Sequence, residues 1–152
     1  MTNSVDELAD SDTIFIIGSN TATAHPLVAT RIFRALEKGA KLVVADPRKN
    51  QIAEFAHLYL RHRPGSDVAL LNAMMKIILE KGNQDQAFIE DHTEEYEGFK
   101  ALIESVDLTE CAAVTGLTVE QMEAAADLYS RPGNSSIVYC MGITQHTNGV
   151  DN

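Results

Sequence analysis

Two short segments rich in apolar residues, 13–17 and 41–45, constrain the fold of this chain more than any other feature. Neither alternates polar with apolar residues, so each predicts a strand buried on both faces, as strands of parallel sheets are. Between them, apolar residues recur at helical spacing from about His25, with Pro26 suited to the first turn and Gly39 to the end. A strand, a helix and a second strand in this order predict the right-handed crossover of a parallel sheet.

The following residues extend this pattern. Residues 57–61 alternate polar with apolar side chains, which predicts a third, less buried strand, and a short helix is predicted before it at 49–55. Apolar residues at helical spacing then predict a strong helix that starts at Ser66 or Asp67 and ends at Gly82. This helix needs an apolar surface to pack on, and the sheet provides it.

Residues 84–131 contain no convincing strand and predict a helical cover. Strand-like residues return at 136–141, and a loop is predicted at 143–152. The predicted helices of the cover span 84–91, 96–105 and 119–130, the last with Thr118 as its N-cap.

We therefore predict one domain over residues 1–152 with an α/β, three-layer, Rossmann-like fold: a mostly parallel sheet, helices on both faces and a helical insertion at about 84–131. A hydrophobic content of 45% is ordinary for one globular domain. No apolar run approaches the roughly 20 residues of a membrane span, so none is predicted. Residues 1–12 lack the basic start and apolar stretch of an export signal, which favours a cytoplasmic location, although such a signal could lie outside this sequence.

Charge and cysteine content exclude some classes of function. The net charge of −10 argues against a nucleic-acid partner. Basic residues concentrate in 31–63 and acidic residues in 80–110; the basic part could face an anion, or both parts could be solvated faces of helices. Cys111 and Cys140 are far apart and suggest neither a disulfide nor a metal site, so we expect two buried, inert thiols.

In open parallel sheets, ligands bind beyond the carboxyl ends of the strands, where four segments of this chain are candidates. The first is the hydroxyl-rich loop from Gly18 to His25, whose amides and side chains could wrap a phosphate or the edge of a pterin. It lacks the later glycines of G-x-G-x-x-G, which weakens a nicotinamide dinucleotide site and leaves an ordinary turn as the alternative. The second pairs Asp46, which could accept from ribose hydroxyls, with Arg48, which could meet a phosphate; a turn with a surface ion pair is the alternative.

The third segment contains Gly65 and Asp67, whose carboxylate could accept from adjacent N–H donors such as those of a guanine edge; the alternative is that Asp67 caps its helix. The fourth begins at Met141, where Gly142 permits a tight turn and Gln145 offers an uncharged donor and acceptor. His146, next to it, is more often structural than catalytic in such a place. No hydrolytic triad and no P-loop motif is present, so binding is favoured over catalysis.

Four motifs in this order resemble those of a known family: I-G-S-N-T-A-T-A-H-P (17–26), A-D-P-R-K (45–49), G-S-D-V-A-L-L-N-A (65–73) and Y-C-M-G-I-T-Q-H-T-N-G (139–149). The chain resembles the bis-molybdopterin guanine dinucleotide (bis-MGD) oxidoreductases, and most closely formate dehydrogenase alpha subunits. The resemblance implies an α/β domain that holds the guanine dinucleotide part of one pterin cofactor, with molybdenum or tungsten ligated elsewhere.

The resemblance also implies residue roles. Gly18, Ser19, Asn20 and Thr21 would line the pyrophosphate and pterin side, Asp46 and Arg48 would hold ribose and phosphates, and Asp67, following Gly65, would recognise guanine. Met141, Gly142 and Gln145 would approach the pterin end.

The implied parent reaction is the two-electron oxidation of formate to carbon dioxide, with an iron–sulfur cluster in a part of the subunit that precedes this sequence. The implied partners are the remainder of the same catalytic subunit and electron-transfer subunits. Because the metal ligand is not in this sequence, we expect the chain by itself to be inactive. The alternatives are a nitrate reductase-type relative, a stand-alone NAD-binding domain, and a non-catalytic interaction module that docks through the acidic helices at 80–130.

Overall fold

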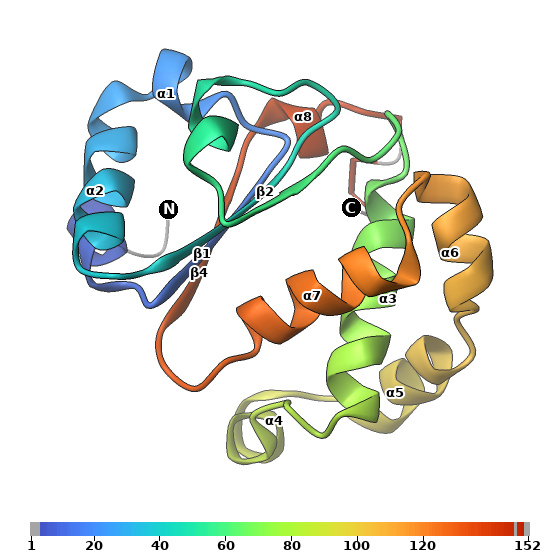
Figure 1. Cartoon of the computed structure of the whole chain (residues 1–152). Coiled ribbons are helices and arrows are strands. Elements are labelled where there is room, and N and C mark those ends of the chain that lie inside the picture. The colour runs from blue at the N-terminus through green and yellow to red at the C-terminus, as the bar shows by residue number, and fades with distance from the viewer. Residues whose placement is uncertain (1–3, 148, 151–152) are drawn as a thin grey trace.

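The structure is a computed structural model that describes residues 4–147 and 149–150. Its centre is a four-stranded sheet in the order β3-β2-β1-β4, in which all paired strands are parallel (Figure 1). Ile17 lies opposite both Ala45 and Tyr139, and Ala45 lies opposite Leu60, so the four strands end at one level. The strands are β1 (Thr13–Ile17), β2 (Lys41–Ala45), β3 (Leu58–Leu60) and β4 (Ser135–Tyr139).

One face of the sheet packs against α2 (Pro26–Glu37) and the 3₁₀ helix η2 (Gln51–Phe55). Alternate residues of β1, Ile14 and Ile16, point to this face and contact α2 through Ile32, which is completely buried. Complete burial of an Ile side chain contributes about 1.5–3 kcal/mol. The continuous apolar run of β1 therefore has a partner on each side, because the other alternate residues serve the opposite face.

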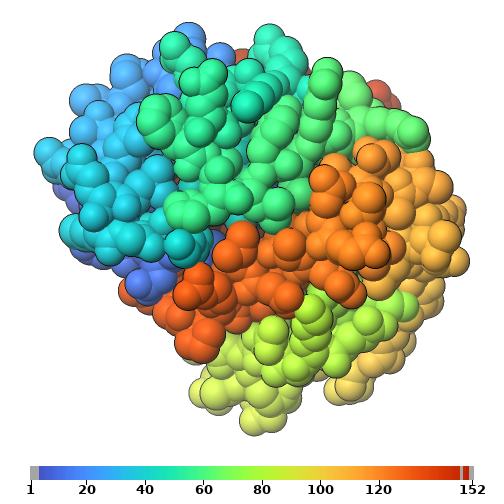
Figure 2. Space-filling view, in the orientation of Figure 1, coloured from blue at the N-terminus to red at the C-terminus, as the bar shows by residue number. Residues whose placement is uncertain are grey.

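The opposite face carries Phe15 and Ile17 of β1 and packs against α3 (Asp67–Glu80) and α7 (Val119–Tyr129). The space-filling view shows α7 in orange between the segment that contains β2 and β3 and the green residues of α3 (Figure 2). The prediction of a parallel sheet with helices on both faces is confirmed.

The helical insertion is also confirmed, but it contains one helix more than predicted. Its members are α4 (Gln86–His92), α5 (Tyr96–Glu104), α6 (Leu108–Thr115) and α7. The sequence analysis missed α6 because Thr and small residues blur its apolar face. The ends of α6 are nevertheless well defined: the Asp107 carboxylate accepts hydrogen bonds from the N–H groups of Thr109 and Glu110, and Gly116 ends the helix at φ 75°.

Two other predictions of local structure need correction, and one further helix was not predicted. Part of the predicted loop after β1 is a one-turn helix, α1 (Thr21–Ala24), because the carbonyl of Asn20 accepts from the N–H groups of Thr23 and Ala24. A second short helix, α8 (Met141–Thr144), takes the last residue of the strand predicted at 136–141 and the start of the loop predicted at 143–152, and the buried Ile143 anchors it. An unpredicted 3₁₀ helix, η1 (Val5–Asp10), is held on α2 by the ion pairs Arg31–Asp6 and Lys38–Asp10. None of the helices in residues 4–147 and 149–150 has both the length and the apolar character that crossing a membrane requires.

Candidate functional site

The loops after the four strands start together because sheet hydrogen bonds continue past the strand ends. The N–H of Gly18 donates to Ala45 O (3.2 Å), that of Asp46 to Leu60 O (3.1 Å), and that of Gly142 to Gly18 O (3.0 Å). All eleven predicted site residues lie on these loops. We call the segments 18–21, 46–50, 61–67 and 140–145 the carboxyl edge; along it they follow the strand order β3-β2-β1-β4, near α1 and α8 in Figure 1.

Gly18 and Gly142 let two of these loops cross in direct contact. Gly18 has φ 58°, and a Cβ added to it would lie 2.7 Å from the carbonyl carbon of Gly142. A Cβ on Gly142 would in turn collide with the Gly18 carbonyl oxygen. Both positions therefore require glycine, and the crossing leaves main chain rather than side chains at the middle of the carboxyl edge.

The hydroxyl groups of the first loop turn inward. Ser19 and Thr21 are buried, and their hydroxyl oxygens lie 2.8 Å apart. Asn20 is half-buried, and its Oδ1 is shielded from solvent without a hydrogen-bond partner within residues 4–147. A buried carbonyl without a donor costs about 1–3 kcal/mol, so Asn20 is the side chain of this loop best prepared to accept a hydrogen bond from a ligand.

Asp46 shapes the second loop. Its Oδ1 accepts from the N–H of Arg48 (2.8 Å) and its Oδ2 from Nδ2 of Asn50 (3.2 Å), and the residue is only 8% exposed. The hydroxyl of Tyr59 donates to the Asp46 carbonyl at 2.8 Å. Burial raises the pKa of Tyr59; the nearby Arg61 guanidinium opposes this effect and the Asp46 carboxylate reinforces it. Arg48 itself is exposed.

Asn50 is a site residue that the sequence analysis missed. Its Nδ2 donates both to Asp46 and to the carbonyl of Ser19 (3.3 Å), while its Oδ1 accepts from Ala53 at the start of η2. Asn50 thus ties the first loop to the second. Its position as an N-cap residue at the start of the predicted short helix, five residues after β2 ends, was the available signal.

Asp67 does not cap its helix, so the alternative interpretation of this residue is wrong. Ser66 occupies the N-cap position without a capping bond, and Asp67 is the first residue of α3. The Asp67 Oδ1 lies 2.9 Å from Nε2 of His62, and both residues are buried. Gly65, at φ 77°, makes the turn between them.

The fourth segment presents Met141, Gly142 and Gln145 at the surface, with Met141 64% exposed. His146 Nε2 lies 2.8 Å from the carbonyl of Gly142, which agrees with the structural role expected for it. One expectation is wrong nearby: Cys140 is only half-buried, with its Sγ 3.9 Å from His25 Nε2.

Cys111, by contrast, is buried as expected. Burial, followed by the nearby carboxylates of Glu110 and Asp107, raises the pKa of its thiol. Within the described part of the chain, no group of three or more His, Cys, Asp or Glu side chains is placed to hold a metal ion.

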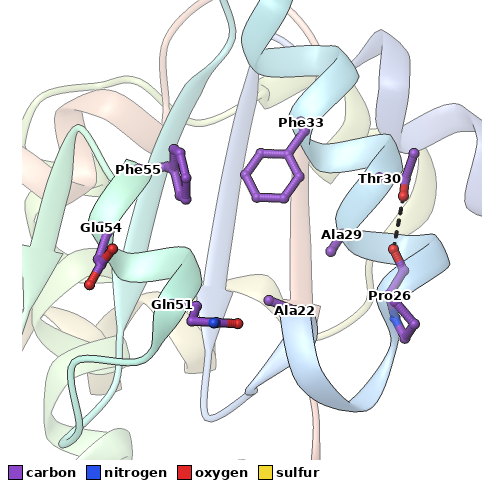
Figure 3. Close-up of a pocket in the computed structure, with 8 residues that line it drawn as sticks. All are labelled: Ala22, Pro26, Ala29, Thr30, Phe33, Gln51, Glu54 and Phe55. Atoms are coloured by element: carbon purple, nitrogen blue, oxygen red, sulfur yellow. Dashed lines mark hydrogen bonds between the residues drawn. The ribbon is translucent and has the colours of Figure 1, made fainter.

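Two surface cavities are lined in part by α1, through Ala22 in one and Thr21 in the other. One of about 450 Å³ lies between α2 and η2, where the rings of Phe33 and Phe55 project toward each other and Ala22 and Gln51 lie at the other end (Figure 3). The other, about 680 Å³, runs along β4. Of the predicted site residues only Thr21 lines either cavity, so the candidate site is an open surface of loops and not one of these hollows.

The fold and this loop arrangement agree with the comparison to known proteins. The family model for molybdopterin oxidoreductases matches residues 1–152, and the chain belongs to the molybdopterin oxidoreductase family. Among curated relatives, it is 44% identical over 152 residues to the F420-dependent formate dehydrogenase 1 subunit alpha of Methanococcus maripaludis, a match that covers 100% of this chain and 23% of that protein. It is 38% identical over 157 residues to a nitrate reductase of Symbiobacterium thermophilum, covering 96% of this chain and 21% of that one.

A solved structure, the acetylene hydratase of Pelobacter acetylenicus, superimposes with a TM-score of 0.87 at 25% identity, over 97% of this chain and 22% of that chain. The chain thus spans less than a quarter of the length of these relatives. Enzymes with different names share this domain, so its fold does not by itself specify a reaction.

Proposed function

We propose that this chain binds the guanine dinucleotide part of a molybdopterin guanine dinucleotide cofactor, as one domain of a formate dehydrogenase catalytic subunit. The observation that carries the proposal is the carboxyl edge, where four loops meet around the Gly18–Gly142 crossing in a member of the molybdopterin oxidoreductase family. Parallel strands direct their following loops and helix N-termini to one edge, which suits an extended, anionic ligand.

The residues at the carboxyl edge fit such a ligand. The glycine crossing brings main chain to the surface, where no side chain blocks close approach. Asn20 offers a buried carbonyl oxygen that lacks a donor among the described residues. Arg48 is exposed beside the Asp46 turn, where its guanidinium can reach a phosphate.

In this proposal the loop of Gly18, Ser19, Asn20 and Thr21 faces the pyrophosphate and pterin side. Asp46 and Arg48 hold ribose and phosphates, and Gly65 and Asp67 accommodate guanine. Met141, Gly142 and Gln145 lie at the pterin end. These residues bind and orient the ligand, and we assign no proton transfer to any of them. When bound, the bis-MGD cofactor with molybdenum or tungsten would supply the two-electron chemistry, together with an iron–sulfur cluster held by another part of the subunit.

The proposal is tested by titrating the isotope-labelled chain with GDP and, separately, with NAD. We expect GDP to shift the amide resonances of the carboxyl edge, and NAD to leave them unchanged. The reverse result would favour a stand-alone NAD-binding domain. Flat titrations with both nucleotides would favour the interaction module, for which the acidic helices α4 to α7 would be the docking face.

Formate as the substrate of the parent enzyme rests on the 44% identity to an F420-dependent formate dehydrogenase subunit, against 38% to a protein named nitrate reductase. Nitrate is therefore the second candidate. We propose the remainder of the same subunit and electron-transfer subunits as partners, and a cytoplasmic location stays a prediction. An assay of the whole subunit should show formate-dependent reduction of a viologen dye. Nitrate-dependent oxidation of the reduced dye would instead support the second candidate.

A further inference from the structure

His62 and Asp67 form a buried pair that no pattern in the sequence singled out. His62 follows β3 by two residues and is 2% exposed, while Asp67 starts α3 and is 3% exposed. Nε2 of His62 lies 2.9 Å from Oδ1 of Asp67. The pair is the most deeply buried polar contact at the carboxyl edge between a side chain predicted to bind the ligand and a residue not assigned to the site.

The chemistry of the two groups determines the direction of this hydrogen bond. A carboxylate only accepts hydrogen bonds, so Nε2 of His62 must carry the hydrogen that it shares with Oδ1. Nδ1 of His62 is buried and has no hydrogen-bond partner within the described residues. An unpartnered buried donor is less common than an unpartnered buried acceptor, which also favours the tautomer with its hydrogen on Nε2.

This bond leaves the two oxygens of Asp67 unequal. Oδ1 is committed to His62, whereas no hydrogen bond to Oδ2 is found in the described structure, and the side chain keeps 5% of its surface exposed. A carboxylate held at one oxygen cannot rotate freely, so its other oxygen points in a fixed direction. Pre-orientation of this kind reduces the entropy that a ligand-binding side chain loses on binding.

We propose that His62 is the positioning residue that fixes the Asp67 carboxylate so that Oδ2 accepts an N–H of the guanine base. The inference rests on the proposed function, since it concerns the base of that ligand. The side of guanine that would face Asp67 presents N–H donors. Adenine instead presents an acceptor at the corresponding ring nitrogen, and this acceptor would face the Asp67 carboxylate unfavourably. His62 thereby contributes to base specificity without touching the base.

The sharpest test exploits the fact that an amide has two different ends. In Asp67→Asn, the His62 N–H should hold the amide oxygen, so that the amide NH₂ group faces the base. We therefore expect the full chain to change from a preference for GDP over ADP to a preference for ADP. In the double variant His62→Leu/Asp67→Asn nothing fixes the amide, and the preference should disappear.

Single variants of His62 and a spectroscopic measurement complete the test. His62→Leu should reduce the GDP-to-ADP preference about tenfold, and His62→Gln, which retains an N–H donor, should recover part of it. His92→Leu, the same substitution at an exposed position, is the matched control and should leave the preference unchanged. The ¹⁵N resonances of the His62 ring should report a hydrogen on Nε2 in the unchanged chain, a readout that needs no ligand and no folded variant.

The outcomes separate the two proposals. If the unchanged chain binds GDP but Asp67→Asn shows the same GDP-to-ADP preference with and without His62, the inference is overturned and the proposed function stands. A ring that carries its hydrogen on Nδ1 alone also overturns the inference, because Nε2 could not then donate. If the unchanged chain binds no GDP, the proposed function fails and the inference fails with it.

Discussion

The carboxyl edge and the helices α4 and α5 are organised in opposite ways. The two central strands that support the edge, β1 and β2, are almost wholly buried, with Ile14 and Ile16 at 0% exposure, whereas the outer strand β4 has no buried residue. By contrast, α4 has no buried residue, α5 has only Ile103, and Leu102 is 65% exposed. Burial is thus greatest in the two strands at the middle of the sheet, whereas α4 and α5 tolerate more change because they bury almost no residue.

The largest contrast is expected between two glycines. Gly142→Ala would place a Cβ against the Gly18 carbonyl, so we expect a loss of about 1–3 kcal/mol in the free energy of unfolding, together with loss of GDP binding. In α5, a Cβ on Gly98 meets nothing within 4 Å, and Gly98→Ala should stabilise the chain by about 0.5–1 kcal/mol. Urea unfolding measures both. If the two substitutions changed the free energy of unfolding equally, the contrast between the carboxyl edge and α5 would be wrong.

The next contrast is between two helix caps. Asn50 caps η2 and also ties Ser19 to Asp46, whereas Asp85 caps α4 with a single bond to the N–H of Phe88. Loss of either cap should lower the free energy of unfolding by about 0.5–2 kcal/mol. Only Asn50→Ala should also weaken GDP binding, because it releases two loops of the carboxyl edge. Thermal unfolding and GDP titration of Asn50→Ala and Asp85→Ala separate the two roles. If Asp85→Ala weakened GDP binding as much as Asn50→Ala does, the assignment of Asn50 to the candidate site would be contradicted.

The smallest expected effect is a pH dependence confined to α6. Backbone hydrogen bonds from Thr109 and Glu110 hold the pKa of Asp107 below its ordinary value of 3.8. A lowered pKa in the folded state means that the carboxylate stabilises α6 above pH 3.8 and that this contribution is lost as the pH falls through the folded pKa. The protection of α6 amides against hydrogen exchange, relative to their intrinsic exchange rate at each pH, should therefore fall on acidification below that value.

Asp107→Asn provides the control for this experiment, since the amide retains a capping oxygen but does not titrate. Its α6 exchange should vary less over the same acid range than that of the unchanged chain. The strands, which rely on apolar burial, should show no such change in either protein. If acidification lowered the protection of β1 amides before that of α6 amides, this prediction would be contradicted.

Periodicity in the sequence correctly predicted every strand and the long helices α2, α3 and α7, because each has a continuous or repeating apolar pattern. It missed α1 and α8, which have four residues each and no face to repeat. Asn50 and His62 also escaped notice as site residues. Both act through neighbours, and the bond of His62 to Asp67 depends on the path of the intervening turn at Gly65.

By itself, the sequence determined the parallel sheet, the two covered faces and the edge at which the candidate site lies. Local apolar spacing decides which faces must be buried, and parallel strands bring their following loops to one side whatever the details. Only the tertiary structure decided which polar atoms at that edge are already bonded and which stay open, such as Oδ1 of Asn20 and the unequal oxygens of Asp67. Hydrogen bonds depend on distances of a few tenths of an ångström between residues far apart in the chain, and no sequence period encodes those distances.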